Sequence, residues 1–213
     1  MEYNQKMLEA KRRLLERFKR EGKTTPAARD RLPPGQHLTQ SFPVLDLGVR
    51  PSFHPARWRF QVEGEVENPI DVDWEGFLQL APKSEQVADF HCVTTWSKFD
   101  VRWGGIKFLD LASLVRPAEQ ARFLIAHSAD GYTTNLPLAD CMAEDVILAW
   151  ELDGQPLPLE HGGPMRLVVP ELYGWKSAKF LRKLVFSAQD QPGFWEVRGY
   201  HNRGNPWAEE RYG

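Results

Sequence analysis

The chain reads VADFHCVTTWSK from Val87 to Lys98, a strand-like run that ends at Cys92 and continues into a polar turn. A thiolate at the end of a strand is well placed to act as a nucleophile or to bind a soft metal ion. A lone cysteine in such a position is more commonly a small, buried hydrophobic residue. That structural interpretation applies even more strongly to Cys141, which follows Leu138-Ala139-Asp140 at the start of a predicted helix. Cys92 by itself therefore leaves the chemistry open.

Short strands separated by turns lie on both sides of this stretch. Apolar and polar residues alternate from Trp58 to Val66, as they do in a strand with one buried face. Further strands are predicted at residues 86–92, 122–127, 146–152, 165–169 and 180–188, and a short helix at residues 108–115. Asp153-Gly154 predicts a tight hairpin, because glycine readily adopts a positive φ. The pattern indicates an α+β fold, dominated by strands with helices at its edges.

The two ends of the chain differ from this central pattern. From Tyr3 to Glu21 the apolar residues recur at helical spacing and the other positions are mostly charged, which predicts an amphipathic N-terminal helix. We favour packing of this helix on the body over binding to a membrane surface or a partner. The predicted organisation is an N-terminal helix at 1–24, a linker at 25–40, one domain at 41–190, and an aromatic tail at 191–213 that wraps the domain.

Composition excludes several classes of protein. The 213 residues carry 27 Lys and Arg against 29 Asp and Glu, a balance that gives no reason to expect a nucleic-acid partner. Two cysteines cannot form a disulfide framework, and this suits a reducing compartment. No apolar run approaches the roughly 20 residues of a transmembrane helix, and the first 23 residues lack the apolar core of a signal peptide. We therefore expect a soluble, cytoplasmic protein.

A second candidate site lies between His161 and Lys179. Its first part reads HGGPMR, and the two glycines allow the backbone to approach a ligand closely. The cations His161, Arg166, Lys176 and Lys179 are suited to hold an anionic group, and the planar arginine fork matches a phosphate. Backbone N–H groups around Ser177 would add to such a cradle. A basic surface loop is the alternative interpretation.

Three segments, in the same order along the chain, resemble one family. HCVTTWS at 91–97 resembles the molybdenum-ligand segment of sulfite oxidase-type molybdopterin enzymes. DGYTTNLPL at 130–138 is similar to the strand that carries their substrate-pocket tyrosine, and the stretch from Asp153 to Pro170 resembles their pterin-binding hairpin and loop. The resemblance covers residues 41–188. It implies a sulfite oxidase-type molybdopterin-binding fold, with mixed sheets and peripheral helices, and a Mo-molybdopterin cofactor.

The resemblance also implies a role for individual residues. In this family a cysteine thiolate and the dithiolene of one molybdopterin hold the molybdenum, and Cys92 matches that cysteine. Tyr132 would line the substrate pocket, and His91 or a nearby cation would keep the Cys92 thiol deprotonated. Ser41 stands where the family often has asparagine or histidine. The cofactor-binding residues implied in this way are His161, Arg166, Ser177, Ala178, Lys179, Ser128 and Ser41.

The substrate is indicated by where the chain departs from sulfite oxidases. Those enzymes neutralise sulfite with two arginines, and the matching positions here hold Ser97 and Thr39. An anionic substrate without positive partners binds poorly, because its desolvation is not compensated, unless Lys98 or Arg102 substitutes. The cysteine segment is closer to that of the bacterial molybdoenzymes that reduce methionine sulfoxide.

The sequence therefore predicts a molybdopterin-dependent oxidoreductase that transfers an oxygen atom, with two electrons, to or from a small sulfur or other heteroatom oxo compound. An unidentified electron carrier would complete the cycle. Two alternatives come from other classes. One is a non-catalytic pterin-binding or carrier module of the same fold. The other is a hydrolase with Cys92 as nucleophile, which needs His161 within hydrogen-bond reach of the thiol.

Overall fold

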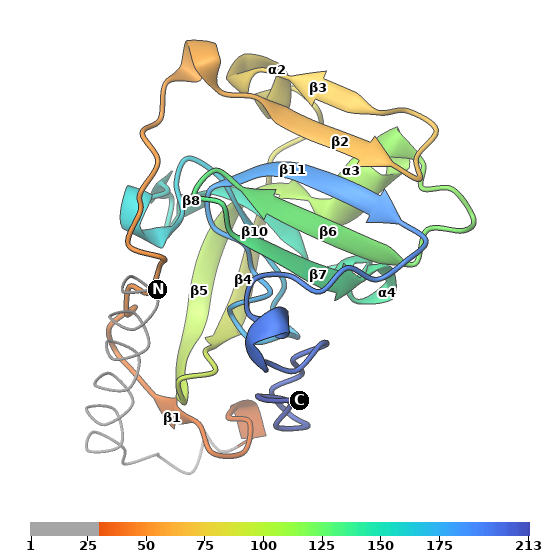
Figure 1. The fold of residues 1–213 in the computed structure, drawn as a ribbon. Helices are drawn as coiled ribbons and strands as arrows, with labels where there is room; N and C mark the ends of the chain where they lie inside the picture. The colour runs from red at the N-terminus through yellow and green to blue at the C-terminus, as the bar shows by residue number, and fades with distance from the viewer. Residues whose placement is uncertain (1–29) are drawn as a thin grey trace.

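The computed structural model describes residues 30–213, so the predicted N-terminal helix and the first part of the predicted linker lie outside the described residues. The described part contains two sheets (Figure 1). The first has the strand order β1 (His37–Leu38), β5 (Trp96–Lys107), β8 (Ile147–Leu152) and β10 (Arg166–Val168), with β4 (Ser84–His91) on β5 and β9 (Gln155–Pro156) on β8. The second has the order β3 (Ile70–Val72), β2 (Phe60–Gly64), β11 (Leu181–Ser187), β6 (Phe123–Ser128) and β7 (Thr133–Pro137).

Helical segments are short and lie at the ends of strands. They are η2 (Pro55–Arg57), α2 (Trp74–Leu78), α3 (Phe108–Val115), α4 (Leu138–Cys141), η3 (Leu159–His161) and η4 (Glu196–Arg198). The Asp73 side chain caps α2 by accepting a hydrogen bond from the Gly76 N–H over 2.9 Å. The predicted helix at 108–115 is confirmed at both ends. Cys141 is the last residue of α4 and not near its start, because this helix already begins at Leu138.

The alternating pattern located the strands well. Each predicted strand corresponds to an observed one with ends that differ by at most two residues. Asp153 and Gly154 form the turn between β8 and β9 with φ values of 51° and 75°, which confirms the predicted hairpin. The α+β class is confirmed. Within the range predicted as a linker, residues 37–38 form β1 and pair with β5.

The longest strand that the pattern did not predict is β5, the central strand of the first sheet. Its sequence contains a turn-like polar start and two consecutive glycines, Gly104 and Gly105, which weaken a strand signal. The register with β8 shifts between these glycines. A Cβ atom at Gly105 would overlap the backbone carbonyl of Leu148, so the close approach of β8 requires glycine there.

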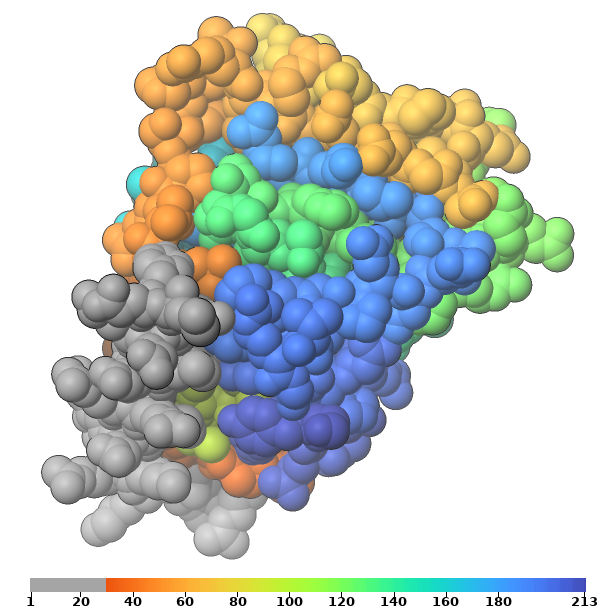
Figure 2. Space-filling model, viewed as in Figure 1, coloured from red at the N-terminus to blue at the C-terminus, as the bar shows by residue number. Residues whose placement is uncertain are grey.

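The C-terminal segment packs against the body. Figure 2 shows the residues after about 190, in dark blue, lying against the lower part of the molecule. Trp195 is 5% exposed. Arg211 donates hydrogen bonds to the carbonyl oxygens of Val93 and Pro34, at 2.9 and 3.1 Å. No helix in residues 30–213 is long and apolar enough to cross a bilayer.

Candidate functional site

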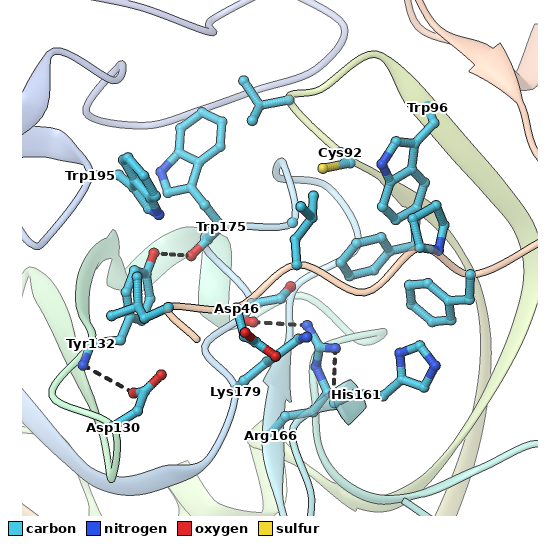
Figure 3. A pocket seen from close by; sticks show the side chains of 18 residues that line it. Asp46, Cys92, Trp96, Asp130, Tyr132, His161, Arg166, Trp175, Lys179 and Trp195 are labelled. Atoms are coloured by element: carbon cyan, nitrogen blue, oxygen red, sulfur yellow. Dashed lines mark hydrogen bonds between the residues drawn. The ribbon is translucent and has the colours of Figure 1, made fainter. Parts of the chain in front are cut away.

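A pocket of about 110 Å³, partly open to solvent, collects residues that are far apart in the sequence (Figure 3). Its wall comes from the segment after β1, the turn between β4 and β5, the turn between β6 and β7, and the residues around β10. Trp195 of the C-terminal segment completes it. The structure brings six of the predicted site residues to this wall: Cys92, Tyr132, His161, Arg166, Ser177 and Lys179.

Cys92 follows β4 and is 8% exposed. Its backbone N–H donates to the Trp96 carbonyl over 2.9 Å, which closes a tight turn and directs the sulfur toward the pocket. The Cys92 Sγ lies 3.2 Å from the hydroxyl of Thr94. Among the described residues, no three His, Cys, Asp or Glu side chains are grouped as a metal site would require. A metal here would therefore take one protein ligand, the thiolate, with the rest from an organic chelate.

The sequence left open whether His91 or a nearby cation keeps the Cys92 thiol deprotonated, and the surroundings of His91 do not suit it to this role. Its Nδ1 lies 2.8 Å from the hydroxyl of Ser97, and the residue is 5% exposed. Burial lowers the pKa of His91 to about 4, against a smaller opposite effect of Asp89. The ring is therefore neutral near pH 7. The lining cation that interacts electrostatically with Cys92 is Lys179.

Arg166 is a buried cation without an acidic partner. Its guanidinium donates to the carbonyl oxygens of His161 and Ser177, both at 2.9 Å, and the residue is 1% exposed. Among the described residues, no carboxylate lies within 4 Å of it. Burial lowers the pKa of Arg166 to about 9. A buried charge of this kind is costly unless an anion balances it.

Lys179 extends this positive region, and His161 lies beside it. The Lys179 Nζ donates to the Glu160 carbonyl over 2.6 Å, and burial, followed by repulsion from Arg166, lowers its pKa to about 7. Gly162 has a φ of 108°, and a Cβ atom there would lie 2.8 Å from the Lys179 side chain. The His161 ring stacks on Phe42 with centroids 4.7 Å apart. Its pKa is lowered by burial and by the two cations. The set is suited to an anionic ligand.

Aromatic side chains line another side of the pocket. The Tyr132 hydroxyl donates to the Trp175 carbonyl over 2.5 Å, and Trp195 lies on the same side (Figure 3). Asp130 accepts a hydrogen bond from the Tyr132 N–H over 3.1 Å, and burial raises the pKa of this carboxyl group. Sequence reasoning did not identify Asp46, Asp130 or Trp195 as pocket residues. Only Trp195 had a signal, the aromatic character of the tail.

Three predicted cofactor-binding residues lie off the pocket wall. The Ser41 hydroxyl is 3.1 Å from that of Thr39. The Ser128 hydroxyl is buried without a hydrogen-bond partner among residues 30–213. Ala178 is buried, and its carbonyl accepts from the Leu167 N–H over 2.9 Å. Their contact with the cofactor stays a prediction.

Lys176 was predicted as part of the anion site, and this is wrong. Its Nζ lies 2.6 Å from a carboxylate oxygen of Glu196, and its side chain is fully buried. It also donates to the carbonyl oxygens of Asn135 and Asn202, at 2.7 and 2.6 Å. All its donors are therefore used by the protein, away from the pocket.

Residues 47–195 match the family described as "Oxidoreductase molybdopterin binding domain". The chain belongs to this family. It is 45% identical over 183 residues to "Uncharacterized oxidoreductase YuiH" of Bacillus subtilis (strain 168), covering 85% of this chain and 92% of that protein. It is 32% identical over 175 residues to "Protein-methionine-sulfoxide reductase catalytic subunit MsrP" of Burkholderia mallei, covering 73% of this chain and 53% of the relative. The chain thus spans about half the length of that relative.

The fold is also found in a solved structure. The sulfane dehydrogenase SoxCD from Paracoccus pantotrophus matches with a TM-score of 0.61 and 21% identity, over 74% of this chain and 46% of that chain. The protein is a molybdopterin-dependent oxidoreductase with a sulfite oxidase-type fold, and the predicted Mo-molybdopterin cofactor is confirmed. The hydrolase alternative gains no support, because no hydrogen bond joins Cys92 to His161 among the described residues.

Proposed function

We propose that this protein reduces a neutral sulfoxide of the methionine sulfoxide type to the thioether. The reaction consumes two electrons and two protons, and it releases the oxygen atom as water. A separate electron-carrier protein supplies the electrons. The MsrP relatives, which are named as protein-methionine-sulfoxide reductase subunits, support this substrate class. The cytoplasmic location stays a prediction.

The pocket residues fit the cofactor. Cys92 would hold the molybdenum through its thiolate, which is the type of ligand that a soft metal selects. Arg166, Lys179 and His161 would hold the pterin and its phosphate, since the two buried cations have only neutral backbone acceptors as hydrogen-bond partners. When bound, the cofactor supplies two-electron oxygen-atom transfer, and the protein orients the substrate and limits the access of water.

The observation that carries the substrate assignment is that one aromatic side of the pocket carries no cation among the described residues. The lining cations Arg166 and Lys179 lie together beside His161, while Tyr132, Trp175 and Trp195 lie on the other side (Figure 3). No lining cation in residues 30–213 is therefore left to neutralise sulfite. An aromatic wall is better suited to the apolar groups of a sulfoxide.

The positions where sulfite oxidases carry arginine support the same conclusion. Thr39 and Ser97 are buried away from the pocket wall, and the Ser97 hydroxyl is engaged by His91. Lys98, a possible substitute, donates to the Gln40 carbonyl over 3.2 Å and does not line the pocket. Arg102 is exposed on β5 and also lies off the wall.

The test compares two substrate classes on one preparation. Protein from molybdenum-replete cells is first shown to contain metal and pterin equimolar with the chain. Reduced benzyl viologen then serves as electron donor for dimethyl sulfoxide and for N-acetylmethioninamide sulfoxide. Ferricyanide serves as acceptor for sulfite. We expect turnover with the sulfoxides and none with sulfite; sulfite oxidation without sulfoxide reduction would contradict the proposal.

A further inference from the structure

Glu196, the residue that follows Trp195, is a buried carboxylate that binds three side chains. One oxygen, Oε1, accepts from the Trp175 Nε1 over 2.9 Å and from the Thr134 hydroxyl over 2.8 Å. The Lys176 ammonium lies 2.6 Å from the same oxygen. The side chain of Glu196 is 2% exposed. A carboxylate held this far from water needs such partners, because an unpaired buried charge is strongly unfavourable.

These contacts connect Glu196 to the aromatic side of the pocket. The Trp175 indole donates a hydrogen bond directly to the Glu196 carboxylate, and Trp195 precedes Glu196 in the chain. Tyr132 is one step further, through its hydrogen bond to the Trp175 carbonyl. The ring of Tyr200 contacts both tryptophans, with centroids 5.1 Å from Trp175 and 4.8 Å from Trp195. The three aromatic residues on that side are thus joined to one carboxylate.

The charge of the pair also matters to the pocket. Lys176 neutralises Glu196 at 2.6 Å, and neither side chain lines the pocket. The carboxylate can therefore orient the Trp175 indole without adding net charge beside Cys92. A neutral pair behind an aromatic wall is compatible with a neutral substrate.

We propose that Glu196 is a positioning residue, which fixes Trp175 and Trp195 in the arrangement that binds the substrate. Through it, the C-terminal segment determines how tightly the oxidoreductase holds a sulfoxide. The identity of this substrate rests on the proposed function, whereas the placement of the tryptophans does not. The two parts can be tested separately.

The first measurement follows the Trp175 indole N–H by NMR in cofactor-free protein labelled with ¹⁵N-tryptophan. The chain has eight tryptophans, and the Trp175 signal is the one that disappears in Trp175→Phe. We expect Glu196→Gln to shift this signal and to speed its exchange with water. Thr134→Val removes one hydrogen bond to the carboxylate but leaves the ion pair with Lys176, so it should give a smaller change in the same direction.

The second measurement is steady-state reduction of N-acetylmethioninamide sulfoxide by the loaded enzyme. Loss of the positioning contact should raise KM about tenfold in Glu196→Gln, the factor that corresponds to roughly one hydrogen bond, with kcat little changed. Metal and pterin content should equal that of the wild type, because the contacts of Arg166 and Lys179 are untouched.

Two matched controls separate positioning from general disturbance. Thr133→Val makes the same chemical change on the neighbouring residue of β7, whose side chain is on the opposite face of the strand. Glu209→Gln removes an exposed carboxylate of the same C-terminal segment. Neither should move the Trp175 signal or KM. If Glu196→Gln does not fold, Thr134→Val against Thr133→Val decides the question.

Each outcome bears on one part of the proposal. An unchanged Trp175 signal in both Glu196→Gln and Thr134→Val would overturn the positioning role. A shifted signal with unchanged KM, or a KM that rises equally in the controls, would overturn the link to substrate binding. If the wild type reduces no sulfoxide, the proposed function fails, while the NMR comparison still decides the placement of the tryptophans.

Discussion

Tyr132 directs its hydroxyl to the backbone carbonyl of Trp175, 2.5 Å away, although its ring lines the pocket. Burial, with a smaller contribution from Glu196, raises the pKa of Tyr132 well above its ordinary value. The hydroxyl therefore stays protonated, and its proton is used in the hydrogen bond to the Trp175 carbonyl. Tyr132 shapes the pocket through its ring and this bond, and it is not arranged to deliver a proton to the substrate.

Tyr132→Phe should accordingly have a mild effect. Loss of one buried hydrogen bond should lower the free energy of unfolding by about 1 kcal/mol, raise KM a few-fold and leave kcat nearly unchanged. A proton donor would behave differently, because removing a general acid typically costs about 10²- to 10⁴-fold in rate. Steady-state kinetics with dimethyl sulfoxide distinguish the two, and a drop in kcat of that size would refute the assignment.

Cys92→Ser should abolish the normal coordination of the metal. A serine oxygen is a harder ligand than a thiolate, so the electronic absorption and the EPR signal of the molybdenum should change, with loss of activity. The control is Cys141→Ser, since Cys141 is fully buried outside the pocket and burial raises its pKa. That variant should keep the spectrum of the wild type. A normal spectrum in Cys92→Ser would show that another group binds the metal.

Arg166→Met should separate cofactor binding from stability. The change removes a buried charge but leaves two carbonyl oxygens without a donor. These effects offset each other, so the free energy of unfolding of cofactor-free protein should change by less than about 2 kcal/mol. Pterin and metal content should fall more than about tenfold, a loss equivalent to over 1.4 kcal/mol of binding.

The matched control for Arg166 is Arg182→Met, because Arg182 lies off the pocket with its guanidinium 5.5 Å from the centroid of the Trp58 ring. Its cofactor content should equal that of the wild type. Cofactor content is measured by metal analysis and by fluorescence of the oxidised pterin. Equal cofactor content in Arg166→Met and the wild type would show that Arg166 does not bind the anionic part of the cofactor.

Lys179 should make the stability of cofactor-free protein depend on pH. Its pKa is about 7 in the folded protein, against 10.5 as the ordinary value, so the unfolded chain binds more protons between these limits. Stability should therefore rise as the pH increases from 7 toward 10. The charged and titratable groups that act on Lys179 are Arg166, Asp46, Arg50, Cys92, His161 and Asp130.

Urea unfolding at pH 7 and pH 9.5 tests this dependence. Wild type should gain stability over Lys179→Met as the pH rises, because the variant has lost the group that titrates. Lys183→Met is the control, since Lys183 forms a surface ion pair with Glu63. A bound anion should weaken the trend, because it favours the protonated Lys179 and raises its pKa in the folded protein. Parallel pH profiles for wild type and Lys179→Met would contradict the prediction.

Local sequence was sufficient for most of the fold. The strand at 58–66 and the helix at 108–115 follow from the spacing of apolar residues, and the Asp153-Gly154 turn follows from the φ that glycine permits. The strand β5 does not follow from local sequence, because its two glycines are explained only by β8, more than 40 residues away. Gly105 faces the backbone of Leu148, and Gly104 faces the side chain of Glu151. A signal that depends on a distant neighbour is absent from any short window of sequence.

The candidate site was predicted in part, for a related reason. Cys92, His161, Arg166 and Lys179 stand in recognisable motifs, and the structure places them around one pocket. The motifs could not show which cation was free to meet a ligand. Lys176 belongs to the same stretch of sequence as Lys179, yet it forms a buried ion pair with Glu196, 20 residues further along the chain.

The sequence by itself determined the class of protein: an α+β domain of the molybdopterin oxidoreductases, with a thiolate and a basic loop as its chemical groups. These are properties of residue type and short-range order. Only the tertiary structure decided that His91 is neutral, that Lys176 is paired with Glu196, and that Trp195 of the C-terminal segment lines the pocket. The charge and contacts of a buried group depend on which distant residues fold against it, because burial is a property of the whole chain.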